Sequence, residues 1–276
     1  MGWEDGDFDY EEENAEEYPR DPAIDAAKAK IRGFFSNHRT TVFYVTQLQV
    51  IFEREFFHWI TGKAVAELIV GGILNDDYTA LTEDGKGRVR FVFHPSCRST
   101  TRQIRRKVKL IRKFSAEPVG RSSGKYAEML FSRDLMINGC KFIAKDASEH
   151  AGRKWEKSDH NLDYIFELDG RTYGCEIKNR FEYISRKEME TKAELCRFLG
   201  LTPLFIVRES PKNYINQINT DYDGFTLIYR TRIYSLGYEE LVREIKNEFY
   251  GLPVDCPSDI PGSIVNRFIG WHRKRH

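Results

Sequence analysis

Residues 162–178 read LDYIFELDGRTYGCEIK, two strand-like runs separated by Asp169-Gly170. An Asp-Gly pair between two such runs is typical of a type I′ turn, in which both central residues have positive φ. A two-residue turn of this kind places Leu168 opposite Arg171 and pairs residues 162–168 with residues 172–178 as antiparallel strands. The segment therefore predicts a β-hairpin whose register is set by its turn.

That register separates the side chains of the hairpin into two groups. One face is almost wholly apolar and carries Tyr164, Phe166, Leu168, Tyr173, Cys175 and Ile177. A slip of one residue would destroy this separation, so the pattern supports the register. On the other face Asp163 is expected to lie opposite Glu176, with Lys178 two residues further along the same strand.

Two opposed carboxylates repel each other in a sheet unless a cation lies between them. Their Cβ atoms would lie about 5 Å apart, which brings both side chains within reach of one ion. Oxygen ligands without thiols or imidazoles suit Mg²⁺ or Mn²⁺ better than zinc. The spacing of Asp163, Glu176 and Lys178 thus predicts a divalent-cation site beside a lysine.

The elements around the hairpin follow a definite order. The chain predicts a helix at 125–137, a strand at 140–145, the two hairpin strands, a helix at 186–199 and a buried strand at 203–207. Asp163, then twelve residues, then Glu176-Ile177-Lys178 resembles the core motif of the PD-(D/E)XK nuclease superfamily, which includes restriction endonucleases and archaeal Holliday-junction resolvases. Leu162 stands where the motif has proline, a common departure, and the resemblance covers about residues 120–208.

The resemblance implies roles for particular residues. Asp163 and Glu176 would hold Mg²⁺ or Mn²⁺, helped by the carbonyl of Ile177, and Lys178 would orient or help to deprotonate the attacking water. Glu128 lies in a stretch that resembles the first helix of the resolvases, so it is expected to complete the metal site. The implied activity is Mg²⁺-dependent hydrolysis of phosphodiester bonds in DNA by an endonuclease.

Residues 23–96 predict a separate domain. Helices are expected at 24–35, after a capping box formed by Thr46 and Gln49, and at 59–70, followed by strands at 78–82 and 88–94. Three helices followed by a hairpin resemble a winged helix-turn-helix, whose third helix would carry Lys63 toward the DNA major groove. The same order also fits a protein-interaction module, and that alternative stays open.

A basic linker helix is expected at 97–119, since residues 98–113 contain eight lysines and arginines and no acid. A polyanion would relieve the repulsion among these charges. The candidate DNA contacts are Lys63, Arg102, Arg105, Arg106, Lys109, Arg112 and Lys113. The alternative is a solvated helix facing residues 1–22, an acidic and predicted disordered arm that we interpret chiefly as a solubilising tail. Residues 116–124 predict a flexible linker into a domain at 120–276, with Ser123 or Gly124 capping its first helix.

The composition of the chain bears on its location in the cell and on its cofactors. No run of about 18 apolar residues occurs, so no membrane partner is expected, and the acidic start is unlike a signal peptide. Five cysteines without CxxC spacing fit a reduced cytoplasmic protein without a zinc site or small-molecule cofactor. Beyond the core, strands at 224–229 and 233–234, a helix at 238–250 and a basic tail helix at 264–276 are expected.

We therefore expect an α/β protein with a restriction endonuclease-like core, a mixed central sheet flanked by helices, and an N-terminal winged helix-turn-helix. The expected activity is DNA cleavage, and a homodimer is one arrangement that would cut both strands. Two alternatives stay open: a non-catalytic DNA-binding regulator that retains a nuclease fold, and an RNA-processing nuclease.

Overall fold

The computed structural model describes residues 21–81 and 87–275, which form an α/β protein. The chain divides into two compact units, Met1–Val119 with Arg243–Leu252, and Gly120–Val242 with Pro253–His276. The segment Arg243–Leu252, expected to extend the second domain, therefore belongs to the first unit. The acidic arm and the tip of the first hairpin, residues 82–86, lie outside the described residues, apart from Asp21 and Pro22.

The first unit begins with three helices: α1 Pro22–Asn37, α2 Val45–Phe52 and α3 His58–Val70. The carboxylate of Asp21 accepts a hydrogen bond from Ala23 N at 2.8 Å and caps α1. The predicted capping box is wrong, because α2 starts at Val45 and its N-cap residue, Tyr44, makes no side-chain capping bond. The apolar sides of the three helices share one core.

A three-stranded antiparallel sheet completes this part of the first unit. Its order is β1-β3-β2, with β1 Val42–Tyr44, β2 Asn75–Ala80 and β3 Arg88–Phe93. The predicted hairpin is confirmed, although β2 starts at Asn75, and β1 was not predicted. The basic helix is α4, Thr100–Ser115, and it buries the side chains of Ile104, Val108 and Ile111.

The predicted linker at 116–124 is wrong, because α5 spans Glu117–Ile137 and follows α4 after Ala116 alone. Proline is well tolerated in the first turn of a helix, which suits Pro118 at the second position of α5. Ser123 is buried inside this helix and does not cap it. Burial along one side of α5 outweighs the low helix propensity of its two glycines.

A mixed five-stranded sheet forms the centre of the second unit, with the order β10-β9-β8-β7-β4. Its strands are β4 Lys141–Ala147, β7 Leu162–Leu168, β8 Arg171–Lys178, β9 Thr202–Val207 and β10 Phe225–Ile228. Strands β4, β7 and β8 are antiparallel neighbours, whereas β8, β9 and β10 run parallel. The expected mixed sheet flanked by helices is therefore confirmed.

The turn between β7 and β8 is the one that the sequence predicts. Asp169 has φ 48° and Gly170 has φ 81°, as a type I′ turn requires. Leu168 pairs with Arg171 and Tyr164 with Cys175, so the predicted register is confirmed over the described ladder. The six apolar residues of the predicted face are all buried. The small hairpin β5 Glu149–His150 and β6 Arg153–Lys154 was not predicted.

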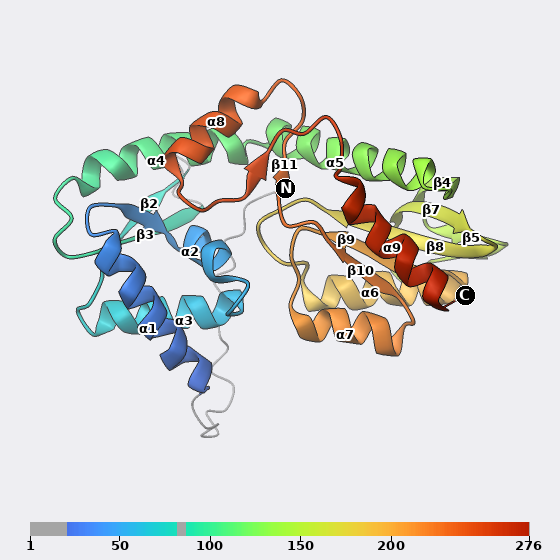
Figure 1. Ribbon diagram of the computed structural model, residues 1–276, viewed down its shortest axis with the longest axis horizontal. Helices are drawn as coiled ribbons and strands as arrows, with labels where there is room; N and C mark the ends of the chain where they lie inside the picture. Colours follow the sequence, from blue (N-terminus) through green and yellow to red (C-terminus); the bar gives the residue numbers. More distant parts are fainter. Residues whose placement is uncertain (1–20, 82–86, 276) are drawn as a thin grey trace. The chain divides into compact units, whose positions relative to one another are not determined.

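Helices cover both faces of the central sheet (Figure 1). Helices α5 and α9, Gly262–Arg275, pack on the face that carries Tyr173 and Ile177. Helices α6, Arg186–Leu199, and α7, Lys212–Asp221, pack on the other face. The remaining elements are α8 Glu239–Glu248, which passes from the second unit into the first, and the strands β11 Arg232–Ile233 and β12 Val254–Asp255. Among the described helices, none is both long and apolar enough to cross a membrane.

Candidate active site

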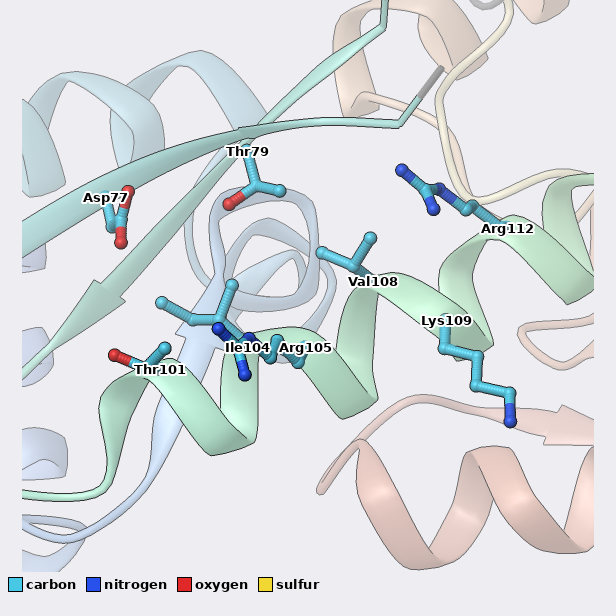
Figure 2. Close-up of a pocket in the computed structure, with 8 residues that line it drawn as sticks. All are labelled: Asp77, Thr79, Thr101, Ile104, Arg105, Val108, Lys109 and Arg112. Atoms are coloured by element: carbon cyan, nitrogen blue, oxygen red, sulfur yellow. The ribbon is translucent and has the colours of Figure 1, made fainter. Parts of the chain in front are cut away.

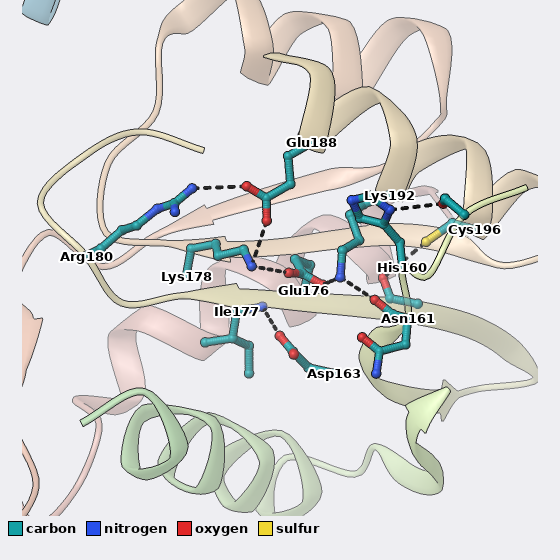
Figure 3. A network of polar contacts seen from close by, with 12 residues as sticks. His160, Asn161, Asp163, Glu176, Ile177, Lys178, Arg180, Glu188, Lys192 and Cys196 are labelled. Atoms are coloured by element: carbon teal, nitrogen blue, oxygen red, sulfur yellow. Dashed lines mark hydrogen bonds and ion pairs between the residues drawn. The ribbon is translucent and has the colours of Figure 1, made fainter. Parts of the chain in front are cut away.

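Glu176 is a buried carboxylate held between two lysines. It lies on β8 and is only 1% exposed. Its Oε1 is 2.7 Å from Lys178 Nζ, and its Oε2 is 2.7 Å from Lys192 Nζ on α6 (Figure 3). Lys192 Nζ also donates a hydrogen bond to the backbone carbonyl of Asn161. Since a buried charge is costly unless it is paired, the two ammonium groups allow a carboxylate to lie inside the fold.

Lys178 is shared between two carboxylates. Besides Glu176, it contacts Glu188 Oε1 at 2.8 Å, and the second oxygen of Glu188 pairs with Arg180 at 3.1 Å. Burial lowers the pKa of Lys178, but the two glutamates outweigh burial and hold this pKa well above its usual value. Lys178 is therefore held protonated in this arrangement, which suits charge stabilisation and orientation of water rather than removal of a proton.

Asp163 lies just beyond the end of the described β7–β8 ladder, whose last pair is Tyr164 with Cys175. Its Oδ2 accepts a hydrogen bond from the backbone N–H of Ile177 at 2.6 Å. Burial raises the pKa of Asp163 to about 7, and Glu176 adds to the rise, while the Ile177 N–H opposes it. A carboxyl group with such a pKa is one that a bound cation would help to ionise.

Glu128 contributes to the same negative field from α5. Its Oε2 lies 3.9 Å from Lys145 Nζ on β4. Burial raises the pKa of Glu128; Lys145 lowers it, and Asp146 and Glu176 raise it further. In turn, the charge of Glu128 raises the pKa of Asp163. Glu128 is thus close enough to affect the other carboxylates, but its only described ion pair is with Lys145.

The sequence-predicted catalytic residues therefore gather around one end of the β7–β8 hairpin without forming a closed set of metal ligands. Over residues 21–81 and 87–275, no three carboxylate, imidazole or thiol side chains are grouped closely enough to hold a metal ion. Both oxygens of Glu176 are engaged by lysines, and the described contact of Ile177 is made by its N–H, toward Asp163. The donor chemistry still fits Mg²⁺, because the candidate ligands are carboxylates, and a bound cation would oppose the burial and the charge of Glu176 that raise the pKa of Asp163.

Sequence reasoning missed two members of this network. Lys192 is not among the residues predicted for the site, yet it is 5% exposed and ion-paired with Glu176. The signal was its position next to Ala193 and between Met189 and Cys196, on a helix side that is otherwise buried. Glu188, which holds Lys178 and Arg180, had no local signal, because the sequence does not reveal which strand its helix approaches.

The cations predicted to contact DNA fall into two groups. Arg106 and Lys113 form ion pairs with acids of α8, and Arg112 donates hydrogen bonds to the backbone carbonyls of Leu81 and Ala80. The other group is exposed and has no polar partner within the described part of the chain. It consists of Lys63, Arg102, Arg105 and Lys109.

Comparison with protein-family models, curated proteins and solved structures finds no match for this chain. A functional assignment therefore depends on the residues and their geometry alone.

Proposed function

We propose that this chain is a Mg²⁺- or Mn²⁺-dependent DNA endonuclease, with a restriction endonuclease-like second unit and a winged-helix first unit. The observation that carries the proposal is the convergence of Asp163, Glu176 and Lys178 at one end of a tight hairpin. That hairpin lies inside a mixed sheet whose elements follow the helix, three strands, helix and strand order of α5, β4, β7, β8, α6 and β9. The two small strands β5 and β6 are inserted between β4 and β7.

Asp163, Glu176 and Glu128 are the residues that would hold the ion, with the carbonyl of Ile177 as a fourth oxygen. A bound divalent ion would polarise the scissile phosphate and lower the pKa of a bound water. Lys178, held protonated, would stabilise the negative charge that develops on the phosphate and orient the water. Glu188 positions Lys178, and Lys192 positions Glu176 from the opposite side.

The winged-helix assignment is supported by the order of elements in the first unit, three helices followed by the β2–β3 hairpin. In such a domain α3 would be the helix that approaches DNA. A single catalytic site cuts one strand at a time, so cleavage of both strands would require two copies of the chain or two successive events. A homodimer stays a proposal to be tested by measuring the mass of the protein in solution.

The test is a cleavage panel with purified full-length protein on duplex DNA, single-stranded DNA, a branched junction and RNA. Each substrate is incubated with Mg²⁺, Mn²⁺ or EDTA. Asp163→Asn and Glu176→Gln should each reduce cleavage by at least about 100-fold, which is the usual effect of removing one group that stabilises the transition state. The matched control is Glu167→Gln, because Glu167 lies on the same strand as Asp163 but pairs with Lys141 at 3.1 Å.

A second candidate is a DNA-binding protein without catalysis, and one observation favours it. Both carboxylate oxygens of Glu176 are engaged by lysines, so an ion would have to displace at least one of them. Binding without cleavage, or equal nicking by the wild-type protein and Asp163→Asn, would favour this candidate. Cleavage of RNA alone would favour the RNA-processing alternative.

A further inference from the structure

A groove of about 540 Å³ runs between helix α4 and strand β2 in the first unit (Figure 2). Its floor is apolar, formed by Ile104 and Val108 of α4, which are 5% and 6% exposed. Hydroxyl groups border it on both sides, from Thr79 on β2 and Thr101 on α4. An apolar floor with polar borders is the usual composition of a binding groove.

Three cations line this groove, and they have different roles. Arg112 donates hydrogen bonds to the carbonyls of Leu81 and Ala80, so it ties the end of the β2 strand to α4 and fixes the wall of the groove. Arg105 and Lys109 are exposed and have no described polar partner. They lie four residues apart on one helix, where like charges repel each other. A bound anion would relieve that repulsion.

Three other cations of α4 contact acidic residues of α8. Arg106 pairs with Glu248 at 3.1 Å, and Lys113 pairs with Glu244 at 2.8 Å. Lys107 is buried and donates a hydrogen bond to the backbone carbonyl of Glu248 at 2.6 Å. Acidic residues of α8 therefore balance part of the charge of α4, whereas Arg105 and Lys109 at the groove have no described ion pair. Lys109 also lines a second pocket, beside Glu244 and Glu248, so Arg105 is the cation at the groove that is more distant from these acids.

Helix α3, the expected DNA-reading helix, has much less positive charge. Lys63 is its only lysine or arginine. His58 pairs with Glu53 at 3.2 Å, and Glu67 pairs with Lys28 at 2.9 Å. Phosphate groups carry one negative charge each and are attracted mainly by uncompensated cations. The charge distribution of the first unit thus favours the α4–β2 groove over the surface of α3.

We propose that the α4–β2 groove binds the phosphodiester backbone of DNA, with Arg105 and Lys109 contacting phosphates. Thr79 and Thr101 donate hydrogen bonds to the same backbone, and the apolar floor packs against the sugars. The nature of the ligand rests on the proposed function, whereas the location of the site rests on the groove alone. Asp77 also lines the groove, and its carboxylate opposes binding.

The test measures the binding of full-length protein to a labelled DNA duplex by fluorescence anisotropy at several salt concentrations in EDTA. The groove variant is the double substitution Arg105→Gln/Lys109→Gln. The control variant, Arg106→Gln/Lys113→Gln, also removes one arginine and one lysine from α4. Each lost phosphate contact reduces the slope of log K against log salt by about 0.9. The groove variant should therefore lose about 2 from the slope, and the control variant should keep the wild-type slope. Asp77→Asn should bind DNA more tightly.

An equal decrease of the salt slope in the two double variants would overturn the proposed groove site, because DNA binding would then depend only on the overall charge of the helix. Unchanged binding by the groove variant, or by Asp77→Asn, would also overturn it. Thermal melts of each variant show whether the fold is intact, and Asp77→Asn tests the groove even if a double variant unfolds. Normal DNA binding by the groove variant, together with cleavage that depends on Asp163, would contradict the binding groove but support the nuclease activity. Loss of DNA binding by the groove variant, together with no cleavage by the wild type, would support the binding groove but contradict the nuclease activity.

Discussion

The raised pKa of Asp163 predicts an unusual dependence of stability on pH. Asp163→Asn removes the ionisable group but keeps an oxygen that can accept the hydrogen bond from Ile177 N, now 2.6 Å from the carboxylate. In metal-free protein, the wild type must bear a charge at this buried position at alkaline pH, and the variant never does. The variant should therefore be more stable than the wild type at pH 8 and equally stable at pH 3.

The magnitude follows from the shift of the pKa of Asp163 from 3.8 to about 7, caused first by burial and then by Glu176. Because the pKa is raised in the folded state, the proton binds more tightly to the folded protein than to the unfolded chain. The stabilisation that this proton gives to the folded state is complete below pH 3.8 and is lost as pH rises through about 7. At about 1.4 kcal/mol per pH unit over this window, the free energies of unfolding of the wild type and Asp163→Asn differ by at most about 4 kcal/mol.

The assay is urea denaturation of both proteins in EDTA at several pH values between 4 and 8, followed by circular dichroism. Glu167→Gln is the control, since Glu167 lies on the same strand in an exposed ion pair with Lys141. The free energy of unfolding of the wild type, relative to Asp163→Asn, should fall steadily between pH 4 and pH 7 and then level off. Parallel pH profiles for the two proteins would refute the raised pKa of Asp163, and with it the effect of burial and of Glu176 on this carboxyl group.

Three destabilising substitutions and one stabilising control test other parts of the fold by urea denaturation. Lys192→Met should lower the free energy of unfolding by about 3 kcal/mol, because it leaves the buried carboxylate of Glu176 with one partner instead of two. Gly174→Ala should lower the free energy of unfolding by about 1–3 kcal/mol, since a Cβ there would lie 2.6 Å from a cysteine sulfur. The control is Gly120→Ala in helix α5, where a Cβ meets nothing within 4 Å, and it should raise the free energy of unfolding by about 0.5–1 kcal/mol. Asn179→Ala should cost on the order of 3 kcal/mol, because its amide makes two hydrogen bonds as donor and two as acceptor. A stability within 0.5 kcal/mol of wild type, the usual range for surface changes, would contradict any of the three destabilising substitutions.

The hairpin could be predicted because its determinants are local. Asp169-Gly170 supplies both positive φ angles, and the alternation of apolar residues on either side of the turn selects one register. The central strands and helices of the second unit follow from the same kind of pattern. These features depend on residues close together in the sequence, so no knowledge of the tertiary structure is needed.

The errors arose where distant parts of the chain decide the structure. Residues 116–124 contain glycines and serines typical of a linker, yet burial of Val119 and Ser123 keeps them helical in α5. The eight cations of the basic segment look equivalent in the sequence, but Glu244 and Glu248 of α8, more than a hundred residues away, neutralise some of them. The same holds for Lys192, whose partner Glu176 lies on another element.

Titration calorimetry tests most directly whether Asp163, Glu176 and their neighbours bind a divalent cation. Mg²⁺ and Mn²⁺ are titrated into metal-free protein at pH 8, with Asp163→Asn and Glu167→Gln measured in parallel. We predict saturable binding to the wild type and to Glu167→Gln, and affinity weakened by at least about 10-fold in Asp163→Asn. Absence of saturable binding to the wild type, or equal affinity in all three proteins, would contradict cation binding by these residues.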